Sequence, residues 1–436
     1  MYFCSRVIFF NFNQIMKKYL FLLLTLMLAG VTAHSQLTVK GEYRSRAEMR
    51  SGYARLNADS LKPAYFVNQR ARIGLYYQKD WLKTGFSFQD VRFWGSDNIF
   101  DATGIYGDDA NFDLNEAWVE LSFAGHSAVK VGRQIFDYDD GRLLSRRNWN
   151  NYGISYDALL YKYNQNKWII DLAFSYNTEF CNTFFNPYPD NKMRTLNFLR
   201  VERIINETWR ASAIAMGTGF TKNNNSETIY LKGSYGGLLK YSNNGLLSWV
   251  TLYYQNGKHH DGREVSAWNL NFKSDYRIGD LTLGFGLTLI SGDENPDDEK
   301  INEFDLLYGT RHSVYGHMDY FNKLPVATDH AGLNNLFLTS AYQINEKTSL
   351  LADYHLFSLN QPLMNENDEL DKYLGSELDL GISVNFSPDV NLRGGYSFML
   401  PGASLEIIQG IGEGKSKFSS WAFLMLTVKP VLYKSR

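Results

Sequence analysis

The feature that most limits the fold of this chain is an alternation of apolar side chains with a period of two. In the first such stretch, residues 36–48, Leu37 and Val39 share one face of an extended strand, whereas Arg44 and Arg46 share the other. One apolar face and one densely charged face suit a strand with lipid on one side and water on the other. The pattern therefore predicts a strand of a membrane β-barrel.

Stretches of this kind recur along the whole chain, and short and long connections alternate between them. We count about eighteen stretches, with sixteen as the lower alternative. The long connections are expected at residues 50–64, 95–111, 138–150, 179–192, 221–225, 256–263, 292–330, 360–371 and 401–417. The short ones carry turn formers, as in Asn243-Asn244-Gly245 and Gly279-Asp280. This rhythm predicts an all-β, transmembrane, antiparallel up-and-down barrel with long extracellular loops, short periplasmic turns and periplasmic termini.

The N-terminal region has the composition of a secretory signal. Met16-Lys17-Lys18 precedes a short apolar run that ends near Ala33-His34-Ser35. We therefore expect residues 1–15 to be an upstream start extension, residues 16–35 a signal peptide and residues 36–436 a single barrel domain in the outer membrane of a Gram-negative bacterium. Only one of the two cysteines, Cys181, would remain after cleavage, so the mature chain could form no internal disulfide.

The formal net charge of −2 conceals where the charges lie. In residues 66–77 the alternation places Ile73 and Leu75 on one face and Arg70 and Arg72 on the other. A cation on the lipid face at mid-membrane costs about 2–4 kcal/mol, so these side chains are expected to point inward. They could merely pair with acidic residues in a packed interior, but the whole set favours a wet, charged channel.

Aromatic residues near the strand ends fit the girdles that mark both membrane interfaces. Stacking on sugars inside a pore is the alternative role. The residues concerned are Tyr76, Tyr77, Trp81, Tyr161, Tyr163, Trp168, Trp209, Tyr253 and Tyr254.

Several blocks of the chain resemble the alginate-export family of outer-membrane barrels. The most specific is residues 129–144, with its Lys-Val-Gly-Arg-Gln strand, acidic turn and Arg-Leu pair, followed by Trp149-Asn150 and Ser155-Tyr156-Asp157. Similar blocks follow at residues 304–321, 352–358 and 373–402. The resemblance implies a barrel of about eighteen strands whose Arg- and Lys-rich constriction passes a polyuronate, and Arg guanidinium groups suit carboxylates well.

Specific residues follow from the resemblance and from the alternation. Expected pore residues are Arg44, Arg46, Arg70, Arg72, Arg92, Arg133, Arg142, Arg146, Arg147, Arg200, Lys273 and Arg277. Expected counter-charges are Asp139, Asp140 and Asp157. An exposed basic loop is the alternative for Arg146 and Arg147. His312, Tyr315 and Asp319 are expected to structure a loop that folds back into the barrel, with direct substrate contact as the alternative.

The sequence thus favours a passive channel for an anionic polysaccharide or its oligomers. A general or small-anion porin is the alternative, and a secreted glycan-binding β-protein is a weaker one. No nucleophile motif indicates an enzyme, and no cofactor or metal site is expected, since residues 293–299 lack calcium-loop spacing and His259-His260 lack a third ligand. Expected partners are outer-membrane lipid and lipopolysaccharide, the polysaccharide and periplasmic polysaccharide-handling proteins, but no nucleic acid. The barrel is expected to be a monomer.

Overall fold

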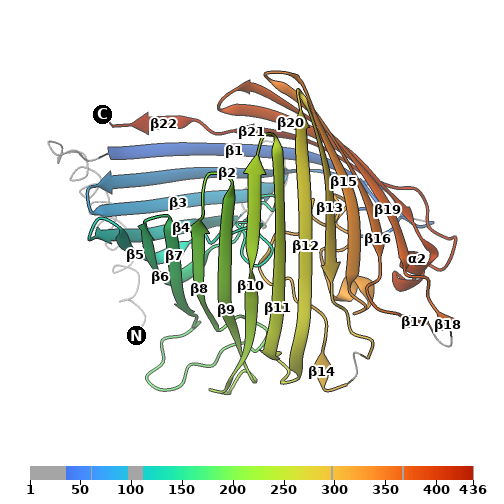
Figure 1. Cartoon of the computed structure of the whole chain (residues 1–436), viewed down its shortest axis with the longest axis horizontal. Coiled ribbons are helices and arrows are strands. Elements are labelled where there is room, and N and C mark those ends of the chain that lie inside the picture. The colour runs from blue at the N-terminus through green and yellow to red at the C-terminus, as the bar shows by residue number, and fades with distance from the viewer. Residues whose placement is uncertain (1–35, 60, 97–110, 296–297, 366–367, 436) are drawn as a thin grey trace, which may run out of the picture.

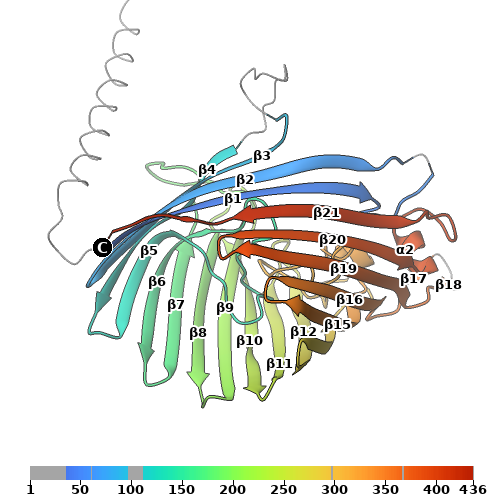
Figure 2. The ribbon, with the colours of Figure 1, turned by 90° about the horizontal axis from the view of Figure 1, so that it is seen from above.

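The strands of this protein close into one barrel. The computed structural model describes residues 36–59, 61–96, 111–295, 298–365 and 368–435. Within these ranges, 18 antiparallel strands form the closed barrel seen in Figures 1 and 2, which confirms the higher of the two expected counts. The expected upstream extension and signal peptide lie outside the described residues.

The elements have the following bounds. The barrel strands are β1 (Gln36–Ser51), β2 (Ala64–Lys79), β3 (Leu82–Phe93), β4 (Asn111–Phe123), β5 (Ser127–Gln134), β6 (Tyr156–Gln165), β7 (Trp168–Tyr176), β8 (Thr195–Ile204), β9 (Trp209–Thr221), β10 (Ile229–Asn243), β11 (Leu246–Lys258), β12 (Glu264–Ile278), β13 (Leu281–Ile290), β15 (Leu333–Asn345), β16 (Thr348–Ser358), β19 (Tyr373–Ser387), β20 (Val390–Pro401) and β21 (Ser419–Val428). The smaller elements are β14 (Lys300–Ile301), β17 (Met364–Asn365), β18 (Asp368–Glu369), β22 (Val431–Lys434), the 3-10 helix η1 (Val326–Thr328) and the helix α2 (Ala403–Ile408). In the described ranges, no helix is long and apolar enough to span a membrane.

The barrel closes because its first strand pairs with its last. On β1, Arg44 lies opposite Arg70 of β2 on one side and opposite Thr427 of β21 on the other. The short β22 continues this edge and places Lys434 opposite Thr38, near the beginning of β1 (Figure 1). Both described ends of the chain therefore lie at the same end of the barrel.

The connections alternate in length as predicted. Tight turns follow β2, β4, β6, β8, β10, β12, β15 and β19, and longer loops make the other connections. In the turn between β10 and β11, Asn244 and Gly245 have φ angles of 46° and 81°. Two successive left-handed residues match the twist of a two-residue hairpin, and Asn and Gly tolerate that conformation best. We call the two ends of the barrel the turn end and the loop end.

The predicted alternation of faces is visible on β2. Ile73 and Leu75 are 44% and 38% exposed on the outside, whereas the side chain of Arg70 is fully buried on the inside. Successive side chains of a strand point to opposite faces, so one strand can serve an apolar surrounding and a polar interior.

The same rule corrects two of the expected girdle residues. Tyr253 is 1% exposed and donates a hydrogen bond to Asp140 inside the barrel, while its neighbour Tyr254 is 44% exposed on the outside. Tyr76 also points inward, where it lines interior cavities. The girdle expectation is wrong for Tyr253 and Tyr76, because adjacent residues of a strand cannot share a face.

Two long connections fold into the barrel. Inner loop A (residues 135–155) joins β5 to β6, and inner loop B (residues 302–332) is the part of the connection from β13 to β15 that follows β14. Phe136 of loop A and Tyr315 and Phe321 of loop B are each at most 1% exposed and belong to one apolar cluster. The interior is therefore divided by packed loops, and its polar space lies between these loops and the wall.

Candidate functional site

Four inward arginines of β1 and β2 lie close together on the barrel wall. This arginine wall consists of Arg44, Arg46, Arg70 and Arg72. The register brings them together, since Arg44 lies opposite Arg70 and Glu42 lies opposite Arg72. Side chains of cross-strand partners on one face are neighbours. The arginines that the alternation predicted one by one therefore form a single group.

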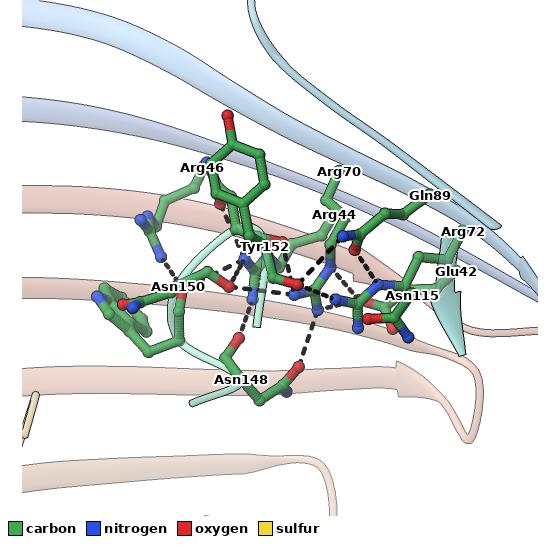
Figure 3. Close-up of polar contacts among 12 residues, drawn as sticks. Glu42, Arg44, Arg46, Arg70, Arg72, Gln89, Asn115, Asn148, Asn150 and Tyr152 are labelled. Carbon is green, nitrogen blue, oxygen red and sulfur yellow. Dashed lines mark hydrogen bonds and ion pairs between the residues drawn. The ribbon is translucent and has the colours of Figure 1, made fainter. Parts of the chain in front are cut away.

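The arginine wall holds inner loop A by its backbone oxygens (Figure 3). Arg44 donates to the carbonyl oxygens of Asn148, Trp149 and Asn150 at 2.6, 3.2 and 3.1 Å. Arg70 donates to the carbonyl of Asn150 at 3.2 Å, and its guanidinium is paired with Glu42. These carbonyls cannot pair with a strand ladder, so the guanidinium forks satisfy them instead.

Arg46 and Arg72 complete this attachment. Arg46 pairs with Glu48 at 2.8 Å and places its guanidinium carbon 4.0 Å from the ring centroid of Trp149. Arg72 donates to Gln89 at 2.8 Å and to the carbonyl of Tyr152 at 2.9 Å. Much of the hydrogen-bonding capacity of the wall is thus used to position loop A.

A histidine and an aspartate of inner loop B contact each other. His312 Nδ1 lies 2.9 Å from Asp319 Oδ1, and Asp319 also accepts a hydrogen bond from Tyr53. Tyr315 is 1% exposed beneath the guanidinium of Arg142, whose carbon lies 5.3 Å from its ring centroid. All three residues expected to structure this loop make contacts within loop B or with neighbouring segments.

The arginines of loop A join it to loop B and to the wall. Arg147 donates to the carbonyls of Gly309 and Leu307, both at 2.8 Å, and burial lowers its pKa to about 10. Arg142 is 4% exposed and lies 3.4 Å from Asp140. Arg147 is therefore not the exposed loop cation that was its alternative, whereas the side chain of Arg146 is 57% exposed.

The expected counter-charges Asp139 and Asp140 both lie inside the barrel. Asp140 accepts hydrogen bonds from Thr251 at 3.0 Å and Tyr253 at 3.2 Å, and burial raises the pKa of its carboxyl. Asp139 pairs with Arg200 at 2.7 Å. Together they attach the acidic turn of loop A to β8 and β11.

The remaining expected pore residues are more scattered. Lys273 pairs with Asp275 at 3.1 Å. Arg92 pairs with Asp90 at 2.8 Å, and both alternate with the inward Gln89 and the buried Val91. Arg92 therefore points outward, and its assignment to the pore is wrong. Arg277 lies at the turn end, where it donates to the carbonyl of Gly279. In the described ranges, neither Lys273 nor Arg277 forms a hydrogen bond or an ion pair with the arginine wall.

Arg133 and Asp157 lie apart from the interior. They are cross-strand partners 4.0 Å apart, with side chains 38% and 67% exposed. Arg133 alternates with the inward Gln134, and Asp157 alternates with the inward Tyr156, so both point outward near the loop end. We correct their assignment: they belong to the outer rim of the barrel, not to its lumen.

Three cavities follow the wall from the loop end to the turn end. The loop-side cavity, of about 540 Å³, is lined by Arg44, Arg146 and Asn148 among others. The central cavity, of about 410 Å³, shares Arg146 and Asn148 with it. The turn-side cavity, of about 490 Å³, shares Lys40 and Tyr76 with the central one. Because they share lining residues, the three cavities adjoin one another along β1, and we call this row of cavities the polar route.

The balance of charge changes along this route. The loop-side cavity is lined by three cationic side chains (Arg44, Arg146, Arg393) and three aspartates (Asp137, Asp139, Asp140). The central cavity has four cations (Lys40, Arg72, Arg146, Lys429) and two glutamates (Glu42, Glu116). The turn-side cavity has three lysines (Lys40, Lys83, Lys434) and no acidic residue among its described lining. Positive charge therefore increases toward the turn end.

Arg146 is the most accessible of the expected arginines on this route. Its side chain is 57% exposed and pairs with Asp137 at 2.7 Å. Because it lines both the loop-side and central cavities, it lies between them. An exposed guanidinium at such a place can exchange its carboxylate for one on a solute.

Some lining residues were absent from the sequence prediction. Lys40 has the same inward parity as Arg44, so the alternation could have selected it. Arg393 shares the inward parity of the buried Ser397 on β20. Lys429 follows the end of β21, and its position depends on a backbone bend in which Pro430 accepts from Gly41. That bend has no local sequence signal.

Comparison with protein families gives one match that spans most of the chain. The family described as alginate export matches residues 35–411. A comparison with curated proteins gave no match.

Solved structures with the same architecture include several outer-membrane channels. OccK9 (OpdG) of Pseudomonas aeruginosa is 14% identical with a TM-score of 0.61, over 90% of this chain and 98% of that chain. OccAB1 of Acinetobacter baumannii is 10% identical with a TM-score of 0.62, over 93% and 98%. OpdK of Pseudomonas aeruginosa, solved with vanillate, is 12% identical with a TM-score of 0.59, over 92% and 99%. At these identities the likeness establishes the fold alone.

Proposed function

Because this chain belongs to the alginate export family, we propose that it is a passive channel for an anionic polysaccharide, such as a polyuronate, or for its oligomers. The protein is an outer-membrane β-barrel channel, and its strands lie in the lipid of that membrane. The loop end then faces the cell exterior and the turn end faces the periplasm.

The observation that carries the proposal is the row of three adjoining cavities in which cations increasingly outnumber acids toward the turn end. A polyuronate presents one carboxylate per sugar, so it could move by exchanging one cationic partner for the next. The aspartates beside Arg44 and Arg146 limit how long a carboxylate would stay, and a pore must release what it binds.

A small-carboxylate porin is the second candidate, and one observation favours it. The two inner loops divide the lumen into cavities of about 410 to 540 Å³, which is the size of sites for single small molecules. A polymer would have to pass them in extended form, one sugar at a time.

Single-channel conductance in a planar bilayer tests the proposal. Oligomers of mannuronate or guluronate should block the current in a concentration-dependent way, whereas neutral oligosaccharides of equal length should not. Arg146→Gln should weaken this block about tenfold, because it removes one charge-assisted contact. Arg55→Gln, at an exposed arginine of the β1–β2 loop, is the matched control.

The outcomes separate the candidates. The small-carboxylate porin would be favoured if the current is anion-selective and responds to single uronate residues but not to oligomers. Current with no anion preference and no response to either would refute both candidates.

A further inference from the structure

The turn-side cavity combines aromatic rings with lysines in a way that suits a charged sugar. It lies where β1, β2, β3 and β4 approach the periplasmic end, and its volume of about 490 Å³ exceeds that of a single pyranose ring. Gln36, Thr38, Gln78 and Thr84 add amide and hydroxyl groups to its lining. These groups match the hydrogen-bonding needs of sugar hydroxyls.

Tyr76 lies flat against the barrel wall. An added Cβ on Gly74 would come within 2.6 Å of the Tyr76 ring, so the ring lies directly over the backbone of Gly74. This leaves the other side of the ring toward the lumen, where it lines both the central and turn-side cavities. The C–H face of a pyranose packs well on an aromatic ring, and here it would take the place of the Lys40 ammonium that lies over this face.

Trp118 repeats this arrangement two strands away. An added Cβ on Gly85 would come within 2.5 Å of the Trp118 ring, and Gly85 lies opposite both Tyr76 and Trp118 in the sheet. Gly74 thus leaves room for the Tyr76 ring against the wall, and Gly85 leaves room for the Trp118 ring. Lys130 Nζ lies 3.9 Å from the Trp118 ring centroid and adds a cation beside them.

Three lysines line the same cavity as these rings: Lys40, Lys83 and Lys434. Lys40 Nζ lies 5.4 Å from the Tyr76 ring centroid, and Lys83 pairs with Glu120 at 3.2 Å. Among the described residues, Lys40 and Lys434 take part in no ion pair. Two lysines without carboxylate partners in one cavity leave a place for an external carboxylate.

We propose that the turn-side cavity is a binding subsite for one uronate residue of an anionic polysaccharide at the periplasmic mouth. Tyr76 supports the face of the pyranose, while Lys40 and Lys434 bind its carboxylate. The subsite rests on the proposed function and adds an asymmetry to it. An anionic chain that arrives from the periplasm meets this cation-rich cavity first, whereas one that arrives from outside meets the charge-balanced loop-side cavity.

One-sided block of single channels tests the subsite. With the full-length protein inserted in one orientation, oligomannuronate is added first to the periplasmic side and then to the extracellular side. The double variant Lys40→Gln/Lys434→Gln should weaken periplasmic block at least tenfold and extracellular block much less. Tyr76→Leu should also weaken periplasmic block, whereas Tyr76→Phe should retain it, because only the ring face is needed.

The control is the double variant Lys62→Gln/Lys415→Gln, which removes two exposed lysines at the loop end. Heat-modifiable gel mobility verifies that each variant folds. If oligomannuronate blocks Lys40→Gln/Lys434→Gln and Tyr76→Leu as strongly as it blocks the wild type, the subsite is overturned. The channel proposal then remains intact. A wild-type channel that oligomannuronate blocks from neither side would overturn both.

Discussion

The indole of Trp149 lies parallel to the imidazole of His312, with ring centroids 4.0 Å apart and an interplanar angle of 6°. Trp149 belongs to inner loop A and His312 to inner loop B, so this stack joins the two segments that divide the lumen. Arg46 of β1 lies on the same tryptophan, 4.0 Å from its centroid. Both loops are therefore tied through one side chain to the arginine wall.

Replacing Trp149 by alanine should loosen both loops. We expect a loss of about 1–3 kcal/mol in the free energy of unfolding, because an aromatic stack and a cation–π contact disappear together. Single channels should show higher and noisier conductance. Trp81→Ala, at an exposed turn-end tryptophan, should change neither quantity, and an equal effect of the two variants would contradict the role of Trp149.

Replacing Arg44 by lysine should free the backbone of loop A even though the charge remains. A lysine ammonium cannot reproduce the planar fork that reaches the carbonyls of Asn148, Trp149 and Asn150. Losing one such charge-assisted bond, worth about 1.5–3 kcal/mol, should speed hydrogen exchange of amides in residues 148–152 at least tenfold. Arg55→Lys is the control, and unchanged protection in Arg44→Lys would count against anchoring by this wall.

The pair formed by Asp139 and Arg200 should be costly to break from one side. Their side chains are 4% and 7% exposed, and Ser212 also donates to Asp139 at 2.7 Å. Arg200→Gln leaves a buried carboxylate unpaired, so we expect a loss of about 3–5 kcal/mol in urea unfolding. The double variant Asp139→Asn/Arg200→Gln should recover part of this loss. Additive losses in a double-mutant cycle would show that the two residues do not interact.

The barrel could be predicted because its information is local. Alternation assigns Arg70 to the lumen and Ile73 to the outside from neighbouring residues alone, and Asn244-Gly245 marks a hairpin by its own conformational preferences. Arg133 shows the limit, because its family-like motif suggested a lumen position while its parity relative to Gln134 turns it outward.

The arrangement of the loops inside the lumen could not be predicted, because it depends on contacts between residues far apart in the sequence. That Arg44 binds loop A backbone about 100 residues away follows only from the closed barrel. The same holds for the stack of Trp149 on His312 and for the place of Lys429 beside Glu42 in the central cavity. Each depends on how a long loop packs inside the barrel, which is a tertiary property.

His317 of loop B should make this loop sensitive to acid. Its backbone N–H donates to Asp379 Oδ2 at 3.4 Å, and its ring Nδ1 lies 3.9 Å from Asp379 Oδ1. Burial lowers the pKa of His317 from its usual 6.5, although Asp379 opposes the shift. The charged and titratable groups around it are His312 of its own loop, and Asp353, His355, Glu377, Asp379 and Arg393 of β16, β19 and β20.

The sign of the effect follows from linkage. At pH values between the lowered pKa of His317 in the packed loop and its usual pKa of about 6.5, His317 binds a proton in a released loop but not in the packed loop. Packing of loop B should therefore weaken as the pH falls below 6.5, by at most about 1.4 kcal/mol per pH unit, and should be unaffected by this group above that value. Current noise recorded from pH 8 to pH 5 should rise in wild type and stay flatter in His317→Gln. His260→Gln, in an outer loop, should behave like wild type, and a His317→Gln profile identical to wild type would assign the acid response to other groups.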